Sequence, residues 1–334
     1  MRVLVLGGTH FFGAEIVKLL LHAGHEVSVF TRGNSQPAWF DKVHHIQGDR
    51  FDPAGFRATL RGQKFDVVVD NIAYNAQDIQ SAIDTFEGNI GRYILTSSCG
   101  VYRFVRERRM PLKEDDVDFE WEPPGYDPDD ARSQYYAGKM TAERALGERP
   151  SIPYTIIRPP IVFGPYDHTL RGFFYVQRLL DGRPLILTNS GTNSFRLAYS
   201  RDLAHAYLLA IDNDAAIGVT YAVAQTDIMT LKDLIDASAE ALGVKPNLVS
   251  IPQDVIAQSD LEYADPYGRM INFIPSVQRV QAELGYVSTP FREWIGETAI
   301  WFRDEYQGPD TEGYGRRDQE VAFAEWYRDR VWLG

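Results

Sequence analysis

A tyrosine and a lysine four residues apart, Tyr135 and Lys139, are suited by type and spacing to acid–base chemistry. Residues four apart lie on the same face of a helix. A nearby ammonium group stabilises a phenolate and lowers the pKa of a tyrosine from its ordinary value of about 10. The spacing therefore predicts that Tyr135 is a usable base near neutral pH.

A glycine-rich turn near the start of the chain predicts an anion site. Residues 2–6 form a short apolar run typical of a buried strand, and Gly7 and Gly8 follow it. Gly13 then begins a helical run. Backbone N–H groups and the dipole at a helix N-terminus favour an anion such as a dinucleotide pyrophosphate. His10 stands where the usual pattern has a glycine, so we expect it to lie beside the phosphates.

Two hydroxyls follow the predicted strand 93–96. At the carboxyl end of a parallel strand they would project toward a ligand. We expect Ser98 to hydrogen-bond the reacting hydroxyl or carbonyl group. The alternative is that Ser97 and Ser98 are turn residues bonded to the nearby backbone.

The elements that must position these side chains alternate between apolar runs and helical patterns. The expected strands are residues 2–6, 26–30, 44–47, 67–71, 93–96 and 154–158. This alternation predicts a doubly wound parallel sheet with helices on both faces, the Rossmann type of α/β fold. We expect a dinucleotide-binding domain at 1–165, to which segments of 195–225 return. Residues 166–306 are expected to form mainly a smaller substrate-binding lobe, and residues 307–334 a C-terminal helical tail.

A long segment, 102–132, joins the fifth strand to the helix that carries Tyr135. Its first part is rich in arginine and its second part in acidic residues. Loops of this length are usually functional or disordered. We interpret it as a mobile flap near the site, with a solvated surface excursion as the alternative.

Composition narrows the class of protein. The 334 residues carry a formal net charge of -12, which disfavours general attraction to nucleic acid or anionic membranes. Cys99 is the single cysteine, so no intramolecular disulfide can form and a reducing compartment is favoured. The sequence has no apolar run of membrane-spanning length and no metal-ligand cluster, and Met1 leads directly into the first strand. We expect a cytoplasmic protein without a metal, possibly a homodimer.

The ordered set of motifs resembles the extended short-chain dehydrogenases/reductases, the superfamily of nucleotide-sugar epimerases and dehydratases. The set consists of GGTHFFG at 7–13, Ser98, Tyr135 with Lys139, IRPPIVFGP at 157–165, Asp202-Leu-Ala204 and VQAELGY at 280–286. The GGxxxxG form is similar to an atypical branch that includes chloroplast stem-loop-binding proteins and bacterial sugar-epimerase homologues.

The resemblance implies a role for each matching residue. Tyr135 would be the acid/base, Lys139 would hold the nicotinamide ribose and Ser98 would polarise the substrate oxygen. Asp49 would meet the adenine, and Pro159 to Val162 would lie against the nicotinamide. The full set of implied cofactor contacts is Gly7, Thr9, His10, Phe11, Phe12, Gly13, Arg32, Asp49, Arg50, Lys139, Pro159 and Val162.

Departures from the family pattern refine the expected chemistry. Residues 31–35 hold Arg32 and lack the acidic residue that binds an unmodified ribose, which favours NADP slightly over NAD. Arg32 could instead stack on adenine. Cys99-Gly100 replaces the Asp-Glu pair of the 4,6-dehydratases, which argues against dehydration by that route. Epimerisation and carbonyl reduction both stay open.

The expected substrate is a sugar or nucleotide sugar. Arg196 and Arg269 would hold its phosphates, and His168 would line the pocket, although surface salt bridges are an equal alternative for the arginines. A different class of function is an RNA-binding or regulatory protein on the same fold. The acidic composition and the complete Ser98, Tyr135 and Lys139 set favour the enzyme.

Overall fold

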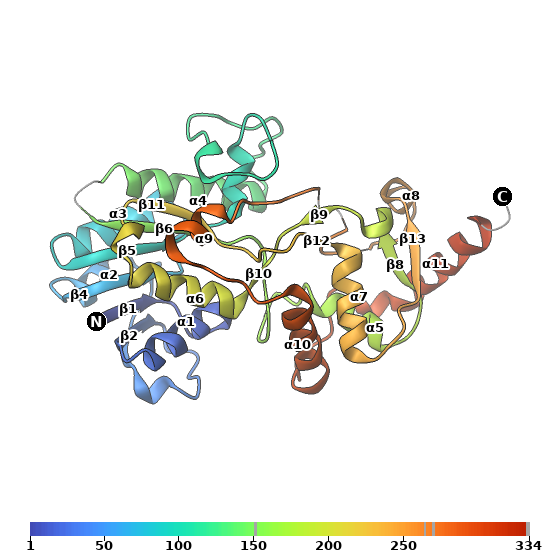
Figure 1. Cartoon of the computed structure of the whole chain (residues 1–334), viewed down its shortest axis with the longest axis horizontal. Coiled ribbons are helices and arrows are strands. Elements are labelled where there is room, and N and C mark those ends of the chain that lie inside the picture. Colours follow the sequence, from blue (N-terminus) through green and yellow to red (C-terminus); the bar gives the residue numbers. More distant parts are fainter. Residues whose placement is uncertain (150–151, 264, 269–270, 332–334) are drawn as a thin grey trace. The chain divides into compact units, whose positions relative to one another are not determined.

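The computed structural model describes residues 1–149, 152–263, 265–268 and 271–331. It divides the chain into two compact units (Figure 1). Unit 1 comprises residues 1–162, 197–224 and 275–288, and unit 2 comprises 163–196, 225–274 and 289–334. The first division falls at residue 162 rather than 165. Residues 275–288, expected in the substrate lobe, belong to unit 1 instead, and the tail belongs to unit 2.

Unit 1 is built on a seven-stranded parallel sheet in the order β11-β6-β5-β4-β1-β2-β3. Its strands are β1 (Arg2–Leu6), β2 (Glu26–Thr31), β3 (His44–Gln47), β4 (Phe65–Asp70), β5 (Ile90–Thr96), β6 (Tyr154–Arg158) and β11 (Val219–Ala222). This confirms the predicted doubly wound parallel sheet and its first six strands. The seventh strand, β11, comes from a chain segment that returns to unit 1.

Helices cover both faces of this sheet (Figure 1). One face carries α1 (Phe11–His22), α6 (Ser200–Ile211) and α9 (Gln278–Leu284), and the other carries α2 (Pro53–Leu60), α3 (Ala76–Phe86) and α4 (Ala131–Gly147). Along β1, Val3 and Val5 face the first group, whereas Leu4 and Leu6 face the second. Because both faces are buried, the strands read as continuous apolar runs.

Unit 2 has a mixed architecture of short elements. Its helices are α5 (Phe173–Leu180), α7 (Leu231–Leu242), α8 (Gln253–Ala257), α10 (Phe291–Asp304) and α11 (Arg317–Val331). β8 (Leu185–Thr188) pairs with β13 (Leu248–Ile251) in parallel, and β9 (Ser194–Phe195) pairs with β12 (Met229–Thr230) antiparallel. The short strand β7 (Val162–Phe163) spans the first division between the units, and β10 (Ala198–Tyr199) follows the second. Among the short 3₁₀ turns, η4 (Asn189–Gly191) and η6 (Tyr314–Arg316) lie in unit 2, and η1 (Phe40–Lys42) and η5 (Asp214–Ala216) lie in unit 1.

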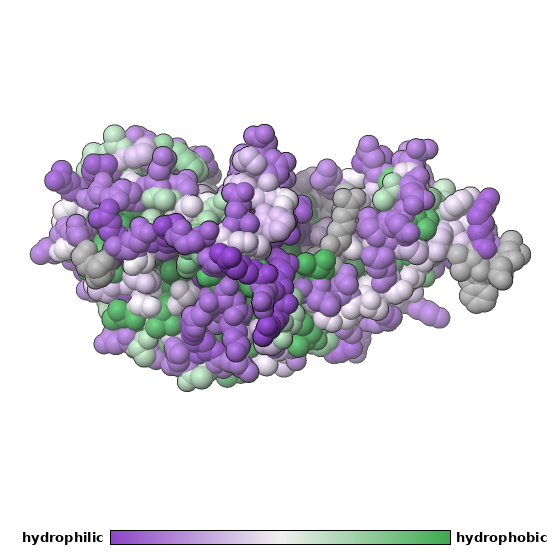
Figure 2. Space-filling model, turned by 90° about the horizontal axis from the view of Figure 1, so that it is seen from above, coloured by the Kyte–Doolittle hydropathy of each residue, from purple (hydrophilic) through white to green (hydrophobic). Residues whose placement is uncertain are grey.

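The face of the molecule seen in Figure 2 is largely polar. Figure 2 shows hydrophilic side chains over much of one face, with hydrophobic side chains in scattered patches between them. Among the helices in the described part of the chain, none is long and apolar enough to cross a membrane.

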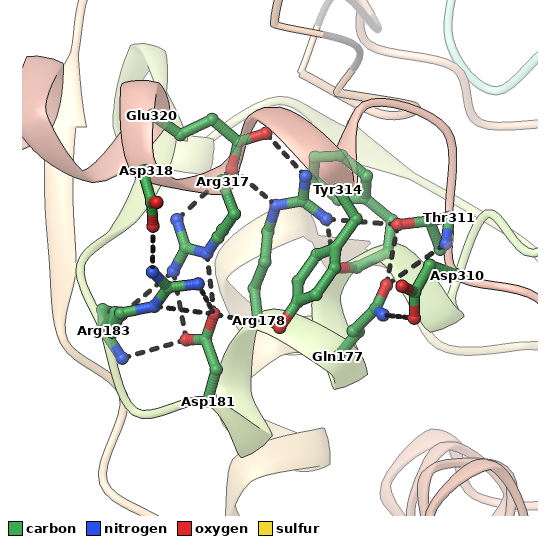
Figure 3. A network of polar contacts seen from close by, with 11 residues as sticks. Gln177, Arg178, Asp181, Arg183, Asp310, Thr311, Tyr314, Arg317, Asp318 and Glu320 are labelled. Carbon is green, nitrogen blue, oxygen red and sulfur yellow. Dashed lines mark hydrogen bonds and ion pairs between the residues drawn. The ribbon is translucent and has the colours of Figure 1, made fainter.

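The C-terminal helix α11 docks on unit 2 through charged side chains (Figure 3). Arg178 Nη2 lies 2.6 Å from Glu320 Oε1, and both side chains are almost fully buried. Arg317 Nε donates to Asp181 Oδ2 at 2.8 Å. The C-terminal helix is therefore held on the rest of unit 2 by ion pairs within its own chain.

Candidate functional site

The glycine turn after β1 packs so closely that side chains are excluded from it. Gly7 and Gly8 have φ values of +89° and +97°, which glycine adopts without strain. A Cβ on Gly8 would lie 2.9 Å from Val5 Cγ1, and one on Gly13 would lie 3.0 Å from Gly8 Cα. The turn thus brings the N-terminus of α1 against the end of β1. This cradle fits the pyrophosphate of a dinucleotide, which backbone N–H groups at a helix N-terminus can bind.

His10 is the N-cap residue of α1, and its side chain is exposed. The imidazole makes no capping bond, and its Nδ1 lies 3.1 Å from Thr9 Oγ1. Phe11 is buried and Phe12 packs partly against the core, with 5.8 Å between their ring centroids. At this turn His10 is therefore the side chain most able to reach an anion, and the phenylalanines hold the turn to the core.

The residues predicted for the adenosine end follow β2 and β3. Arg32 and Asp49 are exposed, and Asp49 Oδ1 accepts a hydrogen bond from the Phe51 N–H at 2.9 Å. Arg50 differs, because its guanidinium is buried and lies 3.1 Å from Asp70 Oδ2. It also stacks on Phe56 at 4.3 Å. The structure thus places Arg50 in the interior, where its hydrogen bonds support the end of β4.

Ser98 lies at the carboxyl end of β5, as the N-cap of η2 (Cys99–Phe104). Its half-buried Oγ accepts a hydrogen bond from the Gly100 N–H at 3.0 Å, which leaves the hydroxyl proton to donate. The Cys99 N–H donates to the Pro159 carbonyl at 2.8 Å, so the ends of β5 and β6 are joined beside Ser98. The geometry is consistent with a turn residue bonded to the nearby backbone and also with a donor to a reacting group. The bond from Gly100 uses a lone pair of the Ser98 oxygen and leaves its hydroxyl proton unused.

Tyr135 and Lys139 share one face of α4. Asp130 caps the N-terminus of this helix, where its carboxylate accepts a hydrogen bond from the Ser133 N–H at 2.7 Å. The Tyr135 side chain is 39% exposed, whereas Lys139 is 2% exposed. Lys139 Nζ lies 5.9 Å from the centre of the Tyr135 ring. A reachable phenol thus stands beside a buried ammonium group, as the spacing predicts.

Backbone carbonyls hold the buried ammonium group in place. Lys139 Nζ donates to the Ala73 carbonyl at 2.7 Å and to the Thr96 carbonyl at 2.8 Å. Ala73 lies just after β4 and Thr96 ends β5, so these bonds fix α4 to the carboxyl edge of the sheet. Burial lowers the pKa of Lys139 to about 8, while the carboxylate of Asp70 acts in the opposite direction.

Two glycines bring the neighbouring segments close to α4. A Cβ on Gly138 would overlap the carbonyl oxygen of Tyr74, and one on Gly100 would overlap the Tyr136 ring. Sequence reasoning missed Tyr74, Gly138 and Gly100 as site residues. A glycine inside a helix, where it is unfavourable, is the signal that could have identified Gly138.

A buried ion pair joins α4 to the end of β6. Arg158 Nη2 lies 2.6 Å from Glu143 Oε2, with 2% and 1% of the two side chains exposed. The Ser97 hydroxyl also donates to Glu143. Ser97 therefore has a buried structural role, whereas Ser98 is half-buried.

The same arginine anchors the long segment 102–132. Arg158 Nη1 donates to the Glu114 carbonyl at 2.8 Å, and the Glu114 carboxylate accepts from the Ala222 N–H at 3.0 Å. Leu112 in the same segment is fully buried. Its middle, around η3 (Glu114–Asp116), is thus built into unit 1. Neither a flap along its whole length nor a solvated excursion describes this segment.

Of the predicted substrate residues, Arg196 and His168 fall in unit 2. Arg196 is half-buried, its Nη2 donates to the Thr226 carbonyl at 2.9 Å, and burial lowers its pKa. His168 is exposed. Arg269 lies outside the described residues. The described catalytic and cofactor candidates all belong to unit 1.

Comparison with family models decides the classification. The model of the NAD dependent epimerase/dehydratase family matches residues 3–224, which include the glycine turn, Ser98, Tyr135 and Lys139. The chain belongs to this family. The match confirms the predicted superfamily, and it spans most of unit 1.

Relatives of the chain carry different names. The chain is 28% identical over 300 residues to the chloroplast stem-loop binding protein of 41 kDa b from Arabidopsis thaliana, covering 85% of this chain and 74% of the relative. It is 26% identical over 263 residues to 2-alkyl-3-oxoalkanoate reductase from Stenotrophomonas maltophilia, covering 73% and 76%.

The fold matches that of solved epimerases. The crystal structure of UDP-glucuronic acid 4-epimerase from Bacillus cereus in complex with NAD aligns with a TM-score of 0.70 at 16% identity, covering 93% of this chain and 99% of that one. At this identity the likeness establishes the fold alone.

Proposed function

We propose that the protein is an NAD(P)-dependent epimerase or reductase acting on a hydroxyl or carbonyl group of a sugar or nucleotide sugar. The observation that carries the proposal is the exposed Tyr135 beside the buried Lys139, at the sheet edge where Ser98 also lies. A bound nicotinamide would accept and return hydride at the reacting carbon. Thr9, His10 and the backbone of 7–13 would hold its phosphates, and Asp49, Pro159 and Val162 would contact its rings.

The side chains divide the proton chemistry between them. Tyr135 takes the proton of the substrate hydroxyl, and the ammonium group of Lys139 stabilises the resulting phenolate. Ser98 donates its hydroxyl proton to the substrate oxygen. In the reductive direction the same groups act in reverse, and Tyr135 supplies the proton. The guanidinium of Arg196 and the imidazole of His168 are proposed contacts for a substrate phosphate.

Replacement of Tyr135 by phenylalanine tests this mechanism. Tyr135→Phe should lower turnover at least ~100-fold, because the proton acceptor is lost, and should leave cofactor affinity almost unchanged. Turnover can be followed by nicotinamide absorbance or by product analysis with a panel of nucleotide sugars and 3-oxoalkanoates. Tyr136→Phe, which removes the adjacent phenol, is the matched control. A Tyr135→Phe enzyme with full activity would overturn the mechanism.

We further propose that NADP is preferred to NAD, because Arg32 is exposed after β2 and can pair with a 2′-phosphate. Arg32→Ala should weaken NADPH binding by about tenfold or more and leave NADH binding nearly unchanged. Calorimetric titration measures both affinities, with the exposed Arg61→Ala as a control. Equal losses for both cofactors would instead indicate that Arg32 stacks on adenine.

The relative named for stem-loop binding favours a second candidate, an RNA-binding protein on this fold. The net charge of -12 weighs against it, since much of the affinity for a nucleic acid comes from Lys and Arg side chains that neutralise its phosphates. Absence of NADPH and NADH binding together with tight, steeply salt-dependent RNA binding would favour this second candidate.

A further inference from the structure

Tyr74 is an aromatic residue beside the candidate acid–base pair that the proposed mechanism does not use. It lies in the loop between β4 and α3, and its ring centre is 4.7 Å from Lys139 Nζ. The Tyr135 ring lies 5.9 Å from the same nitrogen. The two ring centres are 6.4 Å apart. Two tyrosine rings therefore flank one buried ammonium group.

The backbone of Tyr74 is held from both sides. Its N–H donates to Asp78 Oδ2 at 2.7 Å. Its carbonyl oxygen occupies the space that a Cβ on Gly138 would need. The preceding carbonyl, from Ala73, accepts a hydrogen bond from Lys139. One loop thus offers Lys139 both a carbonyl acceptor and a fixed ring face.

An ammonium group in this position needs such support. Lys139 is 2% exposed, and loss of hydration disfavours its charged form. The charged groups around it are Asp70 on β4, Asp78 on α3 and Glu143 on α4, and all three raise its pKa, although burial outweighs them. The face of an aromatic ring attracts a cation most strongly where water is excluded.

The Tyr74 ring stays neutral near neutral pH. Although 40% of the residue is exposed, its partial burial raises the pKa of the phenol, and the nearby Asp70 and Asp78 raise it further. The ring therefore offers an uncharged π face to Lys139, which a phenolate would not.

We propose that Tyr74 is a positioning residue, whose ring face keeps Lys139 charged and holds it beside Tyr135. This rests on the proposed function in one respect, since the benefit to catalysis requires that Tyr135 is the acid/base. The contact between Tyr74 and Lys139 can be tested without substrate or cofactor.

The test follows the titration of Lys139 by NMR. The full chain has seven lysines, so [13Cε]-lysine labelling gives few resonances, and the Lys139 signal is the one lost in Lys139→Arg. Tyr74→Phe keeps the ring face, whereas Tyr74→Leu and Tyr74→Met remove it. The pKa of Lys139 should stay close to that of the wild type in Tyr74→Phe and should fall by about one pH unit in the other two.

Each outcome decides the proposal. An unchanged Lys139 titration in Tyr74→Leu or Tyr74→Met would overturn it, as would an equal fall in Tyr74→Phe, which would assign the effect to the hydroxyl. The six other lysine signals report whether a variant keeps its fold. If Tyr74→Leu does not fold, Tyr74→Met provides the same test. Full activity of Tyr135→Phe would reject the proposed function, but it would not change what the Lys139 titration shows about Tyr74.

Discussion

At the scale of single residues, the candidate site depends on the absence of a side chain as much as on the groups that react. Gly138 lets the loop after β4 touch α4, and this contact sets the Ala73 carbonyl against Lys139 Nζ at 2.7 Å. Tyr135 and Lys139 would keep their helical spacing without it. One acceptor of the ammonium group, the Ala73 carbonyl, however, comes from the loop and would move.

Gly138→Ala should therefore behave unlike an ordinary glycine-to-alanine change in a helix. Alanine is intrinsically better in a helix by about 1 kcal/mol, but the added Cβ meets the Tyr74 carbonyl oxygen, and such overpacking costs about 1–3 kcal/mol. We expect a net loss of about 1 kcal/mol in the free energy of unfolding. Urea denaturation followed by circular dichroism measures it.

Gly147→Ala is the matched control in the same helix, because its Cβ would meet only the Tyr154 hydroxyl at 3.7 Å, an ordinary contact. That variant should be stabilised by up to about 1 kcal/mol. Equal stabilisation of both variants would mean that the loop yields easily and that Gly138 is not required for the close approach.

At the scale of elements, the sequence predicts the sheet well because its strands are buried on both faces. Val3 and Leu4 pack against opposite layers of helices, so successive residues of β1 are all apolar. Such a strand is recognisable as a continuous apolar run, without an alternation of polar and apolar residues. The helix α2 is only eight residues long, too short for a clear helical pattern. Its start was nevertheless marked, since Asp52 caps it by accepting from the Gly55 N–H at 3.0 Å and Pro53 follows.

The site was predictable to the same extent as the elements that carry it. Ser98 follows a strand and Tyr135 lies on a helix, and local patterns reveal both positions. The contacts of Arg50 with Asp70 and of Lys139 with Ala73 join residues 20 and 66 positions apart. No local pattern encodes such pairs, so the burial of Arg50 and the role of Tyr74 became apparent only from the fold.

At the scale of the whole molecule, the chain is divided into six alternating segments and crosses between the units five times. Neither unit is a continuous piece, so truncation cannot isolate one of them. The stabilising forces of each unit are therefore best separated by point substitution. Unit 1 relies on two apolar layers around its sheet. In unit 2, the C-terminal helix α11 is attached by buried charges instead (Figure 3).

The pair of Arg178 and Glu320 provides the test of that attachment. Glu320 accepts from Arg178 at 2.6 Å and from Arg317 at 3.2 Å, so Glu320→Gln leaves a fully buried Arg178 without its counter-charge. Removing one partner of such a pair costs about 3–5 kcal/mol, whereas replacing both partners by apolar residues is often nearly neutral. We expect Glu320→Gln to lower the free energy of unfolding by about 3 kcal/mol in urea denaturation followed by tryptophan fluorescence.

Arg178→Met combined with Glu320→Leu should recover much of the loss, and the exposed Glu325→Gln should change little. If Glu320→Gln were no less stable than Glu325→Gln, α11 would be held by its apolar contacts, such as the buried Ala324, and the charges would contribute little to its docking.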